Sequence, residues 1–229
     1  LPLIDPVYST LNSQAYATAI FKDNESIKNW CLNDSTMLLC TKRFLSGYSS
    51  PEIYLLNSSW VECPYIDKQW YGLRFVDGYI NYVIKQMVND GYYVCFSGVD
   101  DYYLEGKSWY KKRHFAHDGL VFGYDSDSKT YLIYAYDSDW VLNKLTISMK
   151  SFEKGRKAEI KEGIYGYICG LKPMKEKVKF STLKAIKNIS KYLDSSFEKY
   201  PVTEDGQVKG IAVHDYLSCL LYTSPSPRD

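Results

Sequence analysis

The segment 91–140 constrains the fold of this chain more than any other part. It contains two runs rich in aromatic and aliphatic residues, DGLVFGYD and TYLIYAYD, which are separated by the short polar stretch SDSK. Such runs on either side of a short polar stretch are typical of a β-hairpin. The run YYVCFSGV, which lies upstream, predicts a further strand. We therefore expect strands over 92–99, 119–124 and 130–136.

Two residues at the ends of the predicted hairpin suggest a reactive site. His117 stands at the head of one strand, and Asp137 ends the other. In an antiparallel pair these positions fall near the same end of the ladder, where a carboxylate can orient an imidazole. This arrangement supplies the base and the orienting group of a cysteine or serine nucleophile site. The structural alternatives are a rim histidine that only forms hydrogen bonds and an aspartate that only begins a turn.

The rest of the first 172 residues alternates helical patterns with short strands. The stretch 79–89 has a clear helical stripe of apolar residues, and Gly91 follows it as a helix-ending residue. The stretch 26–45 predicts either a helix that begins near Asn29 or a break at Asn33 with a strand beside it. Further elements are expected as helices over 14–21 and 146–155 and a strand over 164–171. Helices first and antiparallel strands later indicate an α+β fold.

The composition changes near residue 173, where the chain becomes rich in lysine and helical in pattern. We expect a domain over 1–172 and a helical region over 173–220, which we expect to be truncated. The last residues, 221–229, resemble translated sequencing-adapter read-through of the kind found on metagenomic proteins. We therefore expect them to be non-native, and we expect the natural protein to continue further.

Charge and cysteine content exclude several classes of protein. The net charge of +1 carries no signal for nucleic-acid or membrane binding. The six cysteines contain no CxxC pair, so the sequence predicts neither a metal site nor a compact disulfide framework. This usage of cysteine fits a reducing cytoplasm. The 23 tyrosines suit twisted sheets and a cleft lined by amphipathic rings.

A nucleophile for the predicted site would be a thiol at the N-terminus of a helix, where the dipole favours thiolate. Cys31 meets this condition if a helix begins near Asn29, and Asn29 is then a cap or a donor to a developing oxyanion. The alternative is that Cys31 only packs in the core.

The connection between the strands predicted over 92–99 and 119–124 is long, aromatic and basic. Such a loop is suited to be a lid or a binding element. Four residues at its start and centre are expected to line a substrate cleft, and these are Asp101, Tyr102, Tyr103 and Trp109.

Three motifs together carry a resemblance to a known family. They are GVDDYYL at 98–104, HDGLVFGYD at 117–125 and YLIYAYDSDW at 131–140. This pattern resembles the N-terminal domain of butirosin biosynthesis protein H and its bacterial relatives, over roughly 1–170 and the helical tail. The resemblance implies a papain-like fold, in which N-terminal helices pack on an antiparallel sheet, with a C-terminal helical extension.

The resemblance also implies a Cys–His–Asp site that needs no cofactor. Such a site transfers or hydrolyses an acyl group in bacterial peptide or secondary-metabolite biosynthesis, and His117 would be its base and Asp137 its orienter. The expected partners are an acyl or peptidyl carrier protein and a small amine or peptide substrate. One register places the nucleophile at Cys31. The other places it near Ala15, where no thiol exists. The chain would then be a degenerate papain-like protein that binds a carrier-bound or peptidyl intermediate.

Overall fold

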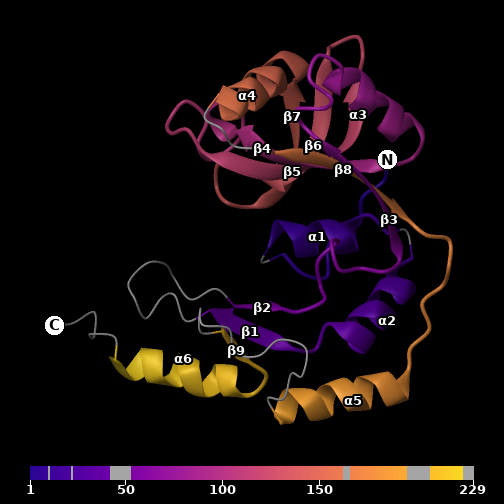
Figure 1. The fold of residues 1–229 in the computed structure, drawn as a ribbon, viewed down its shortest axis with the longest axis vertical. Coiled ribbons are helices and arrows are strands. Elements are labelled where there is room, and N and C mark those ends of the chain that lie inside the picture. Colours follow the sequence, from indigo (N-terminus) through magenta and orange to yellow (C-terminus); the bar gives the residue numbers. More distant parts are fainter. Residues whose placement is uncertain (10, 22, 42–52, 162–165, 195–206, 224–229) are drawn as a thin grey trace. The chain divides into compact units, whose positions relative to one another are not determined.

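The structure, a computed structural model, describes residues 1–229 except 10, 22, 42–52, 162–165, 195–206 and 224–229 (Figure 1). The chain divides into two compact units that are each built from separate segments. Unit 1 comprises Leu1–Lys22 and Cys63–Glu176, and unit 2 comprises Asp23–Glu62 and Lys177–Asp229. The mixture of helices with antiparallel sheets confirms the predicted α+β class.

Unit 1 is built on a six-stranded sheet in the order β3-β8-β4-β5-β6-β7, in which every neighbouring pair is antiparallel. The bounds of its strands are β3 Ile66–Gly72, β4 Tyr93–Asp100, β5 Ala116–Asp125, β6 Thr130–Tyr136, β7 Leu142–Ser148 and β8 Tyr167–Pro173.

The three strands expected in 91–140 are confirmed as β4, β5 and β6, and the strand expected over 164–171 as β8. The expected helix over 146–155 is displaced, because β7 occupies Leu142–Ser148 and helix α4 begins only at Met149. From Lys144 to Ser148 the segment alternates exposed and more buried positions, as an edge strand does. Its pairing with β6 therefore prevails over the helical pattern.

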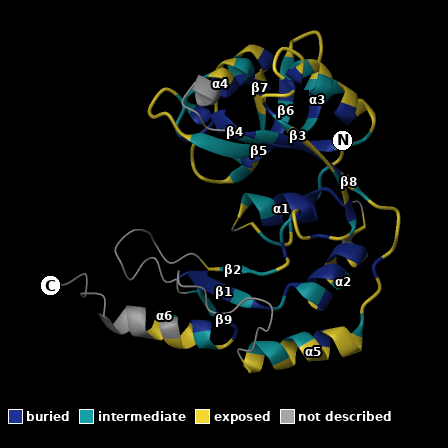
Figure 2. Ribbon diagram, in the orientation of Figure 1, coloured by how far each residue is buried: buried dark blue, intermediate teal, exposed yellow. Residues whose placement is uncertain are grey.

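Helices lie on both faces of this sheet (Figure 1). Helices α3 (Ile80–Asn89) and α4 (Met149–Lys161) share the main hydrophobic core with strand residues such as Phe96 and Ile133. Helix α1 (Asn12–Ala19) packs against β5, and its Tyr16 ring lies 6.3 Å from the ring of Tyr134. The central strands and α1 are accordingly the most buried parts of the unit (Figure 2).

Unit 2 contains a three-stranded antiparallel sheet in the order β2-β1-β9. Its elements are α2 Asn24–Asp34, β1 Leu38–Thr41, β2 Ile53–Leu55, α5 Thr182–Leu193, β9 Gln207–Lys209 and α6 Ala212–Thr223. The break expected near Asn33 is confirmed, since the helix ends at Asp34 and a strand follows.

The expected domain boundary at residue 172 differs from the observed division. Residues beyond Lys177 do not form a separate appended region, because β9 pairs with β1 and α5 packs on α2. This pairing joins segments far apart in the sequence, which no local pattern reveals. Among the described residues, none of the helices combines the length and the apolar character that crossing a bilayer requires.

Candidate functional site at the start of strand β5

The loop between β4 and β5 is closed by the side chain of Asp100. Its Oδ1 accepts hydrogen bonds of 3.0 Å from the backbone N–H groups of Tyr102 and Phe115, at the two ends of the loop. Its Oδ2 lies 2.6 Å from Nδ1 of His114. Asp100 is buried while the His114 side chain is 65% exposed. One buried carboxylate therefore holds both ends of the loop in place.

Asp101, the following residue, reaches His117 instead. Its Oδ2 lies 3.2 Å from His117 Nδ1 and 3.6 Å from the Nζ of Lys107. The Nζ of Lys107 lies 3.4 Å from the same imidazole nitrogen. The loop and the head of β5 thus bring an acid, a base and an imidazole into one cluster, which we call the Asp101 cluster (Asp101, Lys107, His117).

Burial determines the electrostatics of the Asp101 cluster. The side chains of Asp101 and Lys107 are 2% and 1% exposed, whereas that of His117 is 22% exposed. Burial lowers the pKa of Lys107, and the neighbouring Asp101 carboxylate opposes that shift. Asp101 Oδ1 has no hydrogen-bond partner among the described residues. A buried carboxylate that lacks donors is costly, so its contacts with Lys107 and His117 are needed to keep it there.

This need for donors fixes the tautomer that we assign to His117. If Nδ1 carries the proton, it donates to Asp101 and supplies the carboxylate with a hydrogen bond in addition to its contact with the Lys107 ammonium. The other ring nitrogen, Nε2, then keeps its lone pair on a side chain that solvent reaches. The cluster is therefore an oriented imidazole that can accept a proton or a hydrogen bond.

Asp137 does not have the role that the sequence suggested. Its Oδ1 accepts from the backbone N–H groups of Asp139 and Val141 at 2.9 and 3.0 Å, and its Oδ2 accepts from the Asn143 side chain at 3.3 Å. These hydrogen bonds lower the pKa of Asp137. The carboxylate therefore builds the turn after β6, and the carboxylate that contacts His117 is that of Asp101.

Cys31 lies in a different setting from the one predicted. Helix α2 begins at Asn24, with Asp23 as the cap that accepts a hydrogen bond from the N–H of Glu25. Cys31 is thus the eighth residue of the helix, its carbonyl accepts from the Ser35 N–H, and its side chain is buried. The helix start expected near Asn29 is wrong, and Cys31 is not in the first turn, where a negative charge is stabilised.

Asn29 is likewise engaged elsewhere. Its side-chain amide donates a 2.9 Å hydrogen bond to the carbonyl of Val178, which ties α2 to the segment before α5. Because Asp23 caps the helix, Asn29 is not the cap. Its amide donor is used within unit 2 and does not have the expected role of supporting an oxyanion.

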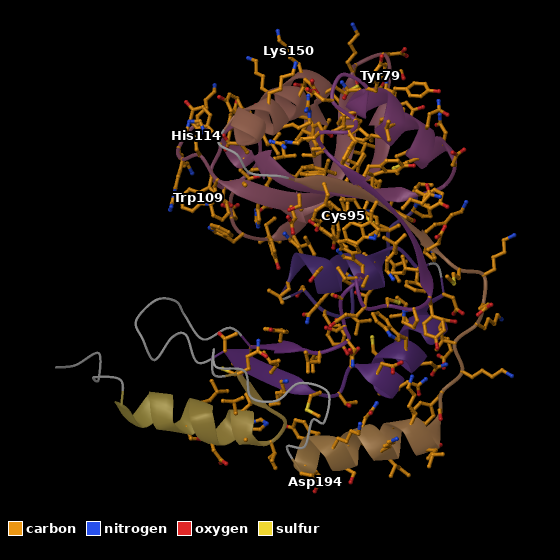
Figure 3. The ribbon with its side chains drawn as sticks, in the orientation of Figure 1. Tyr79, Cys95, Trp109, His114, Lys150 and Asp194 are labelled. Atoms are coloured by element: carbon orange, nitrogen blue, oxygen red, sulfur yellow. The ribbon has the colours of Figure 1, made fainter. Side chains whose placement is uncertain are left out.

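The aromatic residues expected in a cleft pack mainly on one another. The ring of Tyr102 stacks on that of His114 with centroids 4.3 Å apart, and Tyr103 contacts Tyr102 edge-on at 5.2 Å. Trp109 lies at the same end of unit 1 as His114 (Figure 3). The guanidinium carbon of Arg113 lies over the Trp109 ring, 5.6 Å from the ring centroid. These contacts make the loop an ordered aromatic surface.

A continuous series of rings leads from this loop to the imidazole. Trp140 meets Trp109 at 5.9 Å, Trp109 meets Phe115 at 6.2 Å, and Phe115 meets His117 at 5.5 Å. Three of these four residues lie in or beside the loop, and Trp140 belongs to the turn that Asp137 builds. The Asp101 cluster is thereby flanked by a surface suited to an extended, partly apolar ligand.

Helix α1 occupies the other face of the sheet near this site. Ala15 and Tyr16 are fully buried, and the Tyr16 hydroxyl has no partner among the described residues. Burial, assisted by the charges of groups that include Asp118 and Asp101, raises the pKa of Tyr16 well above its usual value. The helix that contacts β5 therefore presents a neutral phenol and small residues, and it contains no thiol.

Unit 1 has three cysteines, Cys63, Cys95 and Cys169, and all are buried. Burial raises the pKa of Cys95 well above its usual value and that of Cys169 to about 12. Both thiols are therefore protonated near neutrality and poorly suited to attack an acyl group.

Lys107 was not among the residues expected at the site, and Asp101, which was expected to line a cleft, contacts both Lys107 and His117. The signal was the doublet Asp100-Asp101 at the end of an apolar strand, followed by two histidines at the end of the same loop. The doublet could have suggested two carboxylate–imidazole pairs. A lysine in a polar loop carries no sign that it will be buried.

No family model matches this chain, and no curated protein is significantly similar to it. The candidate site consequently rests on its own geometry.

Proposed function

We propose that unit 1 is a papain-like ligand-binding domain that holds a peptidyl or carrier-bound intermediate of a bacterial peptide or secondary-metabolite pathway. In this proposal the chain is a degenerate relative of the butirosin biosynthesis protein H family and works in the cytoplasm. Its partners are a carrier protein and the peptide or small amine that the carrier delivers. No covalent bond forms between ligand and protein.

The observation that carries this proposal is the pairing of His117 with Asp101 in a unit whose cysteines are all buried. An oriented imidazole in a unit that offers no accessible thiol of its own is a hydrogen-bond acceptor rather than the base of a nucleophile. Nε2 of His117 can accept from an amide N–H of the ligand, and each extended peptide or pantetheine-like arm offers such groups. The neighbouring rings add apolar contact.

The alternative is a cysteine-dependent acyltransferase or peptidase, and it needs Cys31 as nucleophile. The position of Cys31 in the second half of α2 removes the electrostatic reason for choosing that thiol. The observed geometry therefore favours binding over covalent catalysis.

A blocked dipeptide attached as a thioester to N-acetylcysteamine is a probe that distinguishes non-covalent binding from cysteine-dependent catalysis. We expect it to bind, with shifts in the NMR signals of His117 and its neighbours, and to release thiol no faster than in buffer. His117→Ala should weaken binding by about threefold to tenfold, the equivalent of one hydrogen bond. His214→Ala, a histidine of unit 2, is the control and should leave binding unchanged.

Two results would overturn the proposal. The first is thiol release above background that disappears in Cys31→Ala, which would establish the covalent enzyme. The second is the lack of any saturable binding of the thioester to the unmodified protein.

A further inference from the structure

Unit 1 has an open pocket of about 480 Å³ on the side of the Trp140 turn. Its walls include three aromatic side chains, Tyr134, Tyr136 and Trp140, and the aliphatic Val141 and Leu142. The N-terminal segment forms the remaining wall, and the Tyr136 hydroxyl donates to the carbonyl of Ser9 in that segment.

The charge that the described lining of the pocket contributes is negative. Among the described residues that line it, Asp5 is the single carboxylate, and none is a lysine or an arginine. Tyr134 feels this charge, since burial and then the Asp5 carboxylate raise its pKa. A pocket with aromatic faces and one carboxylate attracts a cation that has an apolar stem.

Trp140 adopts an unusual backbone conformation at the edge of this pocket. The residue has a φ of +60°, in the left-handed region that favours glycine, yet it is a tryptophan and 55% exposed. Asp137 maintains this conformation, because its carbonyl accepts from the Trp140 N–H at 3.2 Å and its carboxylate binds the following residue. The edge-on contact with Trp109 fixes the ring.

We propose that this pocket binds the basic side chain of a peptide, with the ammonium or guanidinium group against Trp140 and Tyr136 and near Asp5. The inference deepens the proposed function and rests on it, because it names the residue type that the bound peptidyl intermediate carries. The ring series from Trp140 through Trp109 and Phe115 to His117 connects the pocket with the Asp101 cluster.

The test uses three blocked tripeptides, Gly-Lys-Gly, Gly-norleucine-Gly and Gly-Glu-Gly, titrated into the isotopically labelled full chain and followed by NMR. The lysine peptide should bind about threefold to tenfold more tightly than the norleucine peptide, as expected for one partly exposed cation–π contact assisted by a carboxylate. The glutamate peptide should bind most weakly. The perturbed signals should include the Trp140 indole N–H.

Variants separate the contributions of charge and ring. Asp5→Asn should reduce the preference for lysine over norleucine without changing the affinity for norleucine. Trp140→Gly, which the backbone conformation accommodates, should weaken both peptides, whereas Trp140→Phe should retain the preference for lysine. Asp127→Asn, an exposed carboxylate in the β5–β6 turn outside the pocket, is the control and should leave all three affinities unchanged.

The proposal is overturned if norleucine binds as tightly as lysine, or if Asp5→Asn leaves the preference intact. It is also overturned if the perturbed signals lie away from the Trp140 turn. His117→Ala should leave the preference for lysine unchanged. If the thioester probe fails to bind while lysine selectivity persists, the proposed function fails and the pocket assignment stands, so the two can be told apart.

Discussion

The imidazole of His117 is paired with the carboxylate of Asp101, whose Oδ2 lies 3.2 Å from Nδ1. Asp101 belongs to the loop that follows β4, and His117 lies at the start of β5. The pair therefore depends on both the loop and the sheet. Lys107 completes the cluster from the same loop. An aspartate that is 98% buried is stable in this position because the Lys107 ammonium balances its charge and the imidazole donates a hydrogen bond to it.

Asp101→Asn should destabilise the protein by roughly 3 kcal/mol, because it leaves the buried Lys107 ammonium without its counter-charge. Urea unfolding measures the change. The double variant Asp101→Asn with Lys107→Met should recover most of this loss, since it removes both charges together. Asp127→Asn, in an exposed turn, serves as the control and should change stability by less than about 0.5 kcal/mol. A single variant as stable as the parent would contradict the burial of the pair.

Asp137→Ala should have a smaller and different effect. It removes the acceptor of two backbone N–H groups in the turn after β6, which costs about 1 kcal/mol by analogy with the loss of a helix cap. The same variant should disturb the NMR signal of the Trp140 indole, since Asp137 holds that turn. If instead the His117 ring signals change most, Asp137 acts on the imidazole and our assignment of its role is incorrect.

Alkaline pH should destabilise unit 1 through its buried thiols. Burial raises the pKa of Cys169 from 9.0 to about 12, so its contribution is complete below pH 9 and is lost progressively between pH 9 and 12. In that interval the unfolded chain releases the proton and the folded protein keeps it, so stability falls as pH rises.

The variant Cys169→Ala measures this thiol contribution by comparison with the parent. Above pH 9 its stability should fall less steeply, by up to about 1.4 kcal/mol per pH unit. Unfolding in urea at pH 8, 9 and 10 provides the slopes. Parallel slopes for the two proteins would show that Cys169 is not buried as a neutral thiol.

Gly119→Ala should destabilise the protein by about 1–3 kcal/mol, as expected when a packed core receives an extra group. A Cβ at this position would overlap the buried ring of Phe96 on the neighbouring strand. The double variant Gly119→Ala with Phe96→Leu vacates part of that space and should cost less than the sum of the two single changes. Additive costs in thermal unfolding would indicate that the two side chains do not meet.

The strands β4, β5 and β6 could be predicted because their signals are local. Runs rich in aromatic and aliphatic residues on either side of a short polar turn specify such a hairpin within about 20 residues. The α+β class followed from the same pattern. Strand β7 was missed because only its pairing with β6 distinguishes LNKLTIS from the start of a helix.

The candidate site was predicted only in part. His117 was singled out because a histidine at the head of a strand is a recognisable signal, and a carboxylate does contact its ring, although it is that of Asp101 and not that of Asp137. The identity of that partner depends on how the loop 101–115 folds back, and this is set by Asp100 contacts with Tyr102 and Phe115. Cys31 was misplaced because the cap at Asp23 starts α2 earlier than Asn29.

The tautomer of His117 tests the central claim most directly. Nitrogen NMR of the isotopically labelled imidazole, recorded on the unmodified protein, Asp101→Asn and Asp137→Asn, distinguishes a proton on Nδ1 from one on Nε2. We predict a proton on Nδ1 in the unmodified protein and in Asp137→Asn, and its redistribution in Asp101→Asn. A proton on Nε2 in the unmodified protein would mean that Lys107 donates to Nδ1, and it would contradict the role given to Asp101.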